Sequence, residues 1–154
     1  MKYTRLFLFA MLCCSFTFCS SVKDGQATIK QGVFGRIRWQ QGNFMPSPDR
    51  PHQSAGVPAA REIYIYQVTK FSETTGESPL FSKIHTKLVA KVKTNKEGYF
   101  QCKLAPGRYS IFTLEEDGRF FASISEGDGS IMPFYVKANE VATVNININY
   151  KAAF

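Results

Sequence analysis

The chain contains few of the residues from which disulfide frameworks and reactive sites are built. Its 154 residues include four cysteines, two histidines and one tryptophan, and three of the cysteines lie within the first 19 residues. That leaves Cys102, which cannot form an internal disulfide alone and has no recognisable histidine partner that would make it a nucleophile. We expect Cys102 to be a buried strand residue, and two isolated histidines predict no metal site. No cofactor is expected.

The chain also has no dense run of carboxylates and no apolar run of the about 20 residues that a membrane-spanning helix requires. The carboxylates of the turns at 115–117 and 126–128 are expected to be solvated or to bind local backbone. The apolar segment at residues 6–18 is short and follows Lys2 and Arg5, a pattern typical of a secretory signal. We expect residues 1–18 to be a signal peptide, and its removal would lower the formal net charge from +7 to +5.

The end of this segment permits two kinds of processing. Cys19 could be the acylated residue of a bacterial lipoprotein signal, although Phe18 stands where that pattern prefers Gly or Ala. Acylation would hold the protein at a membrane surface without spanning it. Ordinary cleavage near Ser20 or Ser21 is the alternative, and residues 19–27 form a short polar tether in either case. The predicted location is the periplasm, the outer membrane or the surface of a bacterium.

The rest of the chain, residues 28–154, shows no helical periodicity and predicts one all-β domain. Short segments that alternate apolar and polar residues are separated by turns rich in Gly and Pro, which predicts a β-sandwich of seven or eight strands with Greek-key connections. Strands are expected around a central motif at residues 28–40, 61–69, 83–93, 120–125, 131–137 and 141–150. A proline-rich loop at residues 42–59 and a polar connection at residues 71–81 separate some of them.

The central motif, TNKEGYFQCKLAPGRYS at residues 94–110, is the most informative segment. Gly98 and the pair Pro106-Gly107 mark two turns, and we expect positive φ at both glycines. The spacing of Thr94, Gly98, Phe100, Leu104, Pro106, Gly107 and Tyr109 follows the pattern T-x-x-x-G-x-F-x-x-x-L-x-P-G-x-Y. In this pattern the chain resembles the carboxypeptidase regulatory-like domains, which are transthyretin-like β-sandwiches.

This resemblance implies a fold and a compartment but no activity. In carboxypeptidases such a domain accompanies the catalytic domain and is not the catalyst, and exported bacterial members often lie in the cell envelope. We therefore expect a non-catalytic structural or interaction module whose partner is an envelope protein or a surface glycan. A small transthyretin-like hydrolase is an alternative, but related hydrolases end in Tyr-Arg-Gly-Ser, and this chain ends in Tyr150-Lys151-Ala152-Ala153-Phe154.

Basic side chains suggest a binding surface. In the strand predicted at residues 83–93, alternation places one set on the same face, namely Lys83, His85, Lys87, Lys91 and Lys93. Arg36 and Arg38 form a smaller copy on the first predicted strand, opposite the face of Val33, Ile37 and Trp39, which we expect to pack in the core. Such a face could attract phosphate or carboxylate groups of a glycolipid or polysaccharide, and this carbohydrate-binding module is the other alternative function. Exposed lysines can also simply keep a sheet soluble.

Two further expectations complete the functional prediction. Nucleic acid is not an expected partner, because its readers usually carry more charge and interleaved aromatic residues and because the protein is expected to be exported. The proline-rich loop is a second candidate for ligand contact, through Phe44, Met45 and His52, since long loops are often functional.

Overall fold

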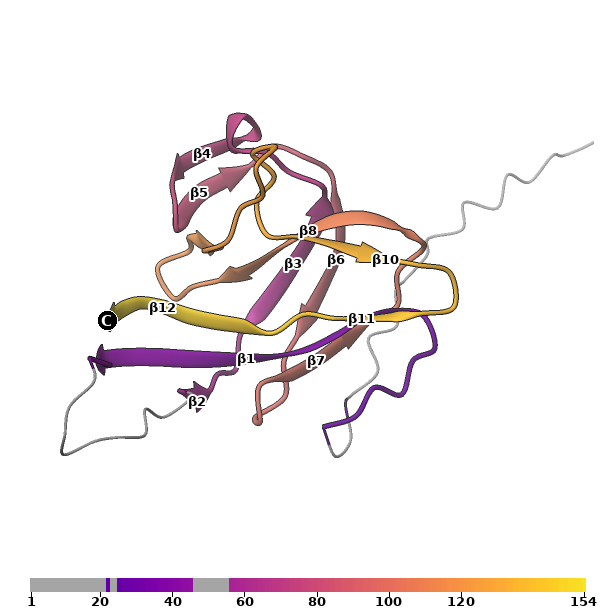
Figure 1. The fold of residues 1–154 in the computed structure, drawn as a ribbon, viewed down its shortest axis with the longest axis horizontal. Coiled ribbons are helices and arrows are strands. Elements are labelled where there is room, and N and C mark those ends of the chain that lie inside the picture. Colours follow the sequence, from indigo (N-terminus) through magenta and orange to yellow (C-terminus); the bar gives the residue numbers. More distant parts are fainter. Residues whose placement is uncertain (1–21, 23–24, 46–55) are drawn as a thin grey trace, which may run out of the picture.

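The computed structural model describes Val22, residues 25–45 and residues 56–154 (Figure 1). The predicted signal peptide at residues 1–18, the predicted lipidation site at Cys19, most of the tether and residues 46–55 of the predicted loop lie outside the described residues. Within the described part of the chain, no helix is long and apolar enough to cross a membrane.

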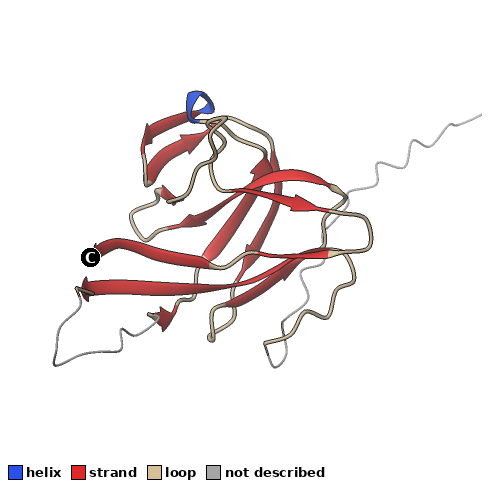
Figure 2. Ribbon diagram, in the orientation of Figure 1, coloured by secondary structure: helices blue, strands red, loops and turns tan. Residues whose placement is uncertain are grey.

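The described residues form two β-sheets and one short 3-10 turn at Phe71–Glu73, so the predicted all-β class is confirmed (Figure 2). The first sheet is built around β1 (Gly32–Asn43). Along one edge, β1 pairs in parallel with β11 (Val141–Thr143) and then with β12 (Ile146–Ala153). Along the other edge it pairs in antiparallel fashion with β2 (Val57–Pro58) and β7 (Tyr99–Cys102).

The second sheet is antiparallel throughout, in the order β4-β5-β9-β8-β3-β6 with β10 beside β8. Its strands are β3 (Glu62–Gln67), β4 (Thr74–Glu77), β5 (Leu80–Ile84), β6 (Leu88–Lys93), β8 (Gly107–Leu114), β9 (Phe120–Phe121) and β10 (Pro133–Val136). In Figure 1, β3 and β6 of this sheet cross behind β12, and the β4–β5 hairpin lies at one end of the sheet.

The two sheets share one hydrophobic core, as expected of a β-sandwich. Val33, Ile37 and Ile148 of the first sheet and Ile63 and Ile111 of the second have no exposed surface. Each comes from the inward-facing positions of its strand, as the period-two alternation predicted. Burial of these side chains is the main favourable contribution to the stability of the fold.

An aromatic cluster covers the other face of the second sheet. Tyr66 and Phe112 project from β3 and β8 on the side opposite Ile63 and Ile111, and they meet edge to face at 5.8 Å between ring centroids. Phe81 of β5 packs against Phe112 at 6.1 Å. Phe112 is therefore fully buried although it does not face the first sheet. This packing explains why both faces of the predicted strand at residues 61–69 are apolar.

The turns of the central motif agree with prediction at the first position and differ at the second. Gly98 has φ of +80°, and its N–H donates to Asn95 O at 3.0 Å. Gly107 does not adopt positive φ, so that expectation was wrong. The second turn is held instead by the Tyr109 hydroxyl, which donates to Ala105 O at 2.9 Å.

Several predicted strands are divided, and the described residues contain twelve strands instead of seven or eight. The strand predicted at residues 83–93 ends at Ile84 and restarts at Leu88, and the one predicted at residues 141–150 is interrupted between Thr143 and Ile146. The polar connection predicted at residues 71–81 instead contains β4 and the first residues of β5.

The break at residues 85–87 has a clear physical cause. The N–H of His85 donates to Glu73 O near β4, whereas Lys87 O accepts from the N–H of Gln67 at the end of β3. Between them, the hydroxyls of Thr86 and Thr69 lie 2.6 Å apart. The chain therefore leaves one strand partner and joins another within three residues.

Candidate functional site

The predicted basic face is divided by this break, and its five residues do not lie on one strand. Lys83 lies on β5 opposite Thr75, whereas Lys91 and Lys93 lie on β6 opposite Tyr64 and Glu62. In the sheet, β9, β8 and β3 separate β5 from β6. His85 and Lys87 lie in the connection between the two strands. The expectation of one continuous strand face was wrong.

Two residues of this set have specific partners. The Lys91 ammonium lies 2.8 Å from the Glu62 carboxylate and 4.8 Å from the centre of the Tyr64 ring. The hydrogen bond between Lys91 and Glu62 raises the pKa of Lys91 and lowers the pKa of Glu62. His85 Nε2 lies 2.8 Å from the Thr75 hydroxyl. Lys91 and His85, which the predicted binding face would have offered to a ligand, are therefore paired with other side chains of the protein.

The other chemically notable residues are placed as follows. Cys102 lies in β7 and is 2% exposed, which confirms the expectation of a buried strand residue. His52 lies outside the described residues. Among the residues that the structure describes, no three or more His, Cys, Asp or Glu side chains are grouped in a way that could hold a metal ion.

A polar groove of about 380 Å³ lies over β1 and β12, and we call it the arginine–asparagine groove. It is lined by Arg36, Arg38, Gln40, Asn145 and Asn147. The groove residues that belong to β1 alternate along the strand with its core residues Val33 and Ile37. The register places Arg38 directly opposite Asn147 of β12. The parallel pairing of β1 and β12 therefore joins a basic row to a row of amides.

Local contacts hold one end of this groove in place. The N–H of Arg36 donates to Asn145 Oδ1 at 3.1 Å, and its Nε donates to Glu97 O at 3.0 Å. The guanidinium also lies 4.7 Å from the centre of the Tyr99 ring. Arg36 is thus oriented by the backbone of a turn and by an aromatic face before any ligand is present. The sequence suggested the arginine pair but not its amide partners.

A second groove, of about 390 Å³, opens where the two sheets separate near the end of β1. We call it the Trp39 groove, and it is lined by Trp39, Gln41, residues 57–60, Arg61, Glu116, Tyr150 and Lys151. Trp39 is half-buried and packs against the core, in agreement with the sequence-based expectation, but it also forms a wall of this groove.

A buried carboxylate lies beside the Trp39 groove. Glu115 is 3% exposed and accepts hydrogen bonds from the Thr113 hydroxyl at 2.9 Å, the Tyr150 hydroxyl at 3.2 Å and Arg61 Nε at 3.4 Å. Burial, followed by the nearby Glu115 carboxylate, raises the pKa of Tyr150 to about 12. The expectation that the carboxylates of residues 115–117 are solvated was wrong for Glu115.

A signal for this network was present in the sequence. Glu115 continues the alternation of Ile111 and Thr113, both of which face inward, and Tyr150 continues that of Ile146 and Ile148. Two inward-facing rows that each end in a polar residue predict a polar contact at the end of the sandwich.

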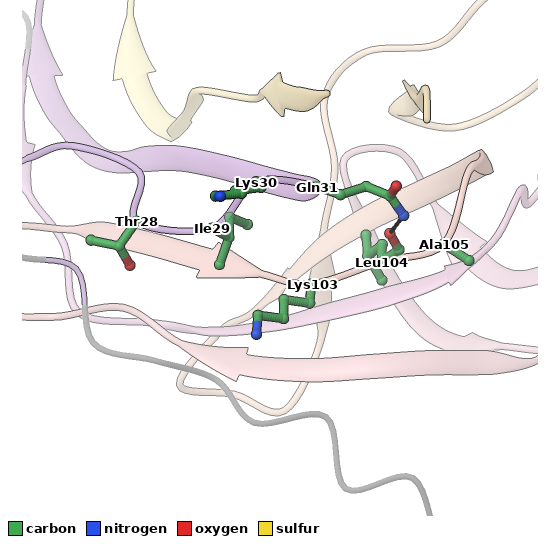
Figure 3. A pocket seen from close by; sticks show the side chains of 7 residues that line it. All are labelled: Thr28, Ile29, Lys30, Gln31, Lys103, Leu104 and Ala105. Carbon is green, nitrogen blue, oxygen red and sulfur yellow. Dashed lines mark hydrogen bonds between the residues drawn. The ribbon is translucent and has the colours of Figure 1, made fainter. Parts of the chain in front are cut away.

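A third depression, of about 660 Å³, lies between residues 28–31 and residues 103–105 (Figure 3). Gln31 Nε2 donates to Leu104 O at 2.9 Å, as the dashed line shows. The N–H of Thr28 donates to Gln101 Oε1, and Gln101 Nε2 donates back to the Thr28 hydroxyl. These reciprocal bonds attach the segment before β1 to β7, so we interpret this depression as a packing feature.

Comparisons of the chain with protein-family models, with curated proteins and with solved structures found no match.

Proposed function

We propose that this protein is an exported, non-catalytic module of the bacterial cell envelope that binds an anionic surface glycan. Its domain is a Greek-key, transthyretin-like sandwich of the carboxypeptidase regulatory-like kind. The turn at Gly98 and the two packed sheets support that assignment. A rigid sandwich with ligand groups on its surface is a common arrangement for binding modules, because the scaffold fixes the groups in advance.

The arginine–asparagine groove carries this proposal. It joins Arg36 and Arg38 to the amides of Gln40, Asn145 and Asn147, and none of these five lining residues is acidic. Guanidinium groups match the geometry of carboxylate and phosphate oxygens, and amides bind the hydroxyls of a sugar. The groove therefore suits a glycan that carries acidic groups.

Binding of an acidic oligosaccharide to the exported protein tests the proposal. With oligogalacturonate as the probe, the double variant Arg36→Gln, Arg38→Gln should bind at least about ten-fold more weakly in calorimetry, since charge-assisted hydrogen bonds are lost. The matched control is Lys83→Gln, Lys87→Gln, which removes the same charge from the basic face predicted by the sequence. If the control weakens binding and the arginine variant does not, the ligand binds at the lysines and the groove assignment is wrong.

The export and anchoring part of the proposal depends on residues 1–19 and has its own test. Cys19→Ala should move the protein from the membrane fraction to the soluble envelope fraction, because the acylated residue is removed. Unchanged fractionation of the variant would contradict lipid anchoring and favour ordinary cleavage near Ser20 or Ser21.

A further inference from the structure

The Trp39 groove is separate from the arginine–asparagine groove. Trp39 and Arg38 are consecutive residues of β1, so their side chains point to opposite faces of the first sheet. The groove has one wall from each sheet: Tyr150 and Lys151 belong to β12, whereas Arg61 directly precedes β3. It is therefore the open end of the space between the two sheets.

Trp39 lies at the edge of the core, where it lines the groove. Its ring meets the Tyr150 ring edge to face at 5.3 Å, and its Nε1 donates to Gln41 Oε1 at 3.2 Å. The Arg61 guanidinium and the Lys151 ammonium lie 5.5 and 5.7 Å from the ring centre. The indole is fixed in position and still forms part of a surface groove.

The polar groups around the indole are also fixed in advance. Glu115 accepts hydrogen bonds from both Arg61 and Tyr150, which keeps these two side chains in the wall of the groove. Arg61 Nη1 donates in addition to Ala60 O at 3.1 Å. Lys151 and Glu116, by contrast, are exposed and can reorient toward a bound molecule.

We propose that the Trp39 groove binds a neutral saccharide unit. The negative face of an aromatic ring attracts the weakly positive C–H groups of a sugar ring, and Gln41, Glu116 and Lys151 supply acceptors and donors for its hydroxyls. Lys151 would leave the indole and donate to a ligand hydroxyl.

The charge and size of the groove agree with this ligand class. The two cations, Arg61 and Lys151, are balanced by Glu116 and the buried Glu115, so the groove has no excess charge to attract an anion. A volume of about 390 Å³ falls in the range of small-molecule sites, near its lower end. This inference does not depend on the anionic-glycan proposal, because the two grooves share no residue.

Trp39 is the only tryptophan in the chain, so its fluorescence reports directly on this groove. We expect at least one neutral disaccharide among cellobiose, maltose, lactose and N,N′-diacetylchitobiose to change the fluorescence saturably, with the same affinity in calorimetry. Glu116→Gln and Lys151→Met should each weaken that binding about ten-fold, since each removes a charged hydrogen-bonding partner. Both residues are exposed, so the variants should fold.

The controls use the exposed pair Lys137 and Glu140, which lies outside the groove. Lys137→Met and Glu140→Gln make the same substitutions and should leave the affinity unchanged, as should Arg36→Gln with Arg38→Gln. The proposal is overturned if no neutral disaccharide gives a saturable change at millimolar concentration, or if Glu116→Gln and Lys151→Met both bind as tightly as the unchanged protein. The proposal would also be overturned if the protein bound oligogalacturonate but none of the neutral disaccharides. If the arginine variant then lost that binding, the result would support the anionic-glycan proposal.

Discussion

Glu115 shows how one residue can link stability to a candidate site. Its carboxylate is buried at the end of β8, yet three donors satisfy it: Thr113, Tyr150 and Arg61. A buried charge is tolerated when such hydrogen bonds replace those of water. Removing the carboxylate would leave a buried hydroxyl and a partly buried guanidinium without their acceptor, and it would release the walls of the Trp39 groove.

We therefore expect Glu115→Ala to lower the free energy of unfolding by about 2 kcal/mol, the cost of leaving buried donors unpaired. Glu140→Ala is the matched control, because Glu140 is exposed and lies 3.8 Å from Lys137 in a surface pair. That substitution should change the free energy by less than about 0.5 kcal/mol. Urea unfolding of the two variants and the unchanged protein measures the difference. Equal stability of the two variants would show that the buried network contributes nothing.

At the scale of the element, alternation predicted which side chains are buried within each strand, but it did not predict where strands are interrupted. Period two depends only on neighbouring residues, so the inward positions of β1 and β12 were right. The break at residues 85–87 arises because the chain changes partner strand, whereas the strands on either side of residues 144–145 both pair with β1. Partners that lie far away in the sequence decide this, and the alternation at residues 83–93 continues through the break.

The chain between β11 and β12, at residues 144–145, passes very close to Gly35 of β1. The N–H of Val144 donates to Phe34 O, and the Val144 carbonyl then crosses so close to Gly35 that an added Cβ would lie 1.7 Å from its oxygen. The same Cβ would lie 2.8 Å from the Phe100 ring. Since a backbone carbonyl and a core ring cannot both move aside cheaply, only glycine fits where β11 ends and β12 begins.

Gly35→Ala should therefore lower the free energy of unfolding by about 2 to 3 kcal/mol, as overpacking does in a close-packed interior. Gly127→Ala is the control, because an added Cβ there meets nothing within 4 Å and the backbone does not have positive φ. It should be neutral or slightly stabilising. Chemical denaturation of both variants measures the two free energies of unfolding. If Gly35→Ala left the free energy unchanged, the close contact between Gly35 and Val144 would not be what fixes the chain at residues 144–145.

At the scale of the whole molecule, the sequence predicted the fold class better than the candidate sites. The two-sheet arrangement follows from local signals, namely alternation and turn residues such as Gly98. Both grooves are instead assembled from distant segments: Arg36 and Asn145 are 109 positions apart, and Arg61 and Glu115 are 54 apart. Alternation on the first predicted strand suggested Arg36 and Arg38, but their amide partners depend on the register of β1 and β12, for which no local signal exists.

The shared core leads to a prediction about the whole fold. Because buried residues of both sheets belong to one cluster, neither sheet keeps its buried face if the other unfolds, and unfolding should be a single cooperative transition. Urea unfolding followed by Trp39 fluorescence, which reports on the first sheet, should coincide with unfolding followed by far-ultraviolet circular dichroism.

A substitution in the second sheet makes this test sharper. Ile111→Val, at a fully buried position of β8, should lower the free energy of unfolding by about 1 kcal/mol. Although Trp39 belongs to the other sheet, its fluorescence transition should shift by the same amount as the circular dichroism transition, because both probes report the same equilibrium. Separate midpoints, or a shift in circular dichroism without one in fluorescence, would mean that the two sheets unfold independently. In that case the Trp39 groove, which takes one wall from each sheet, could open without loss of the rest of the fold.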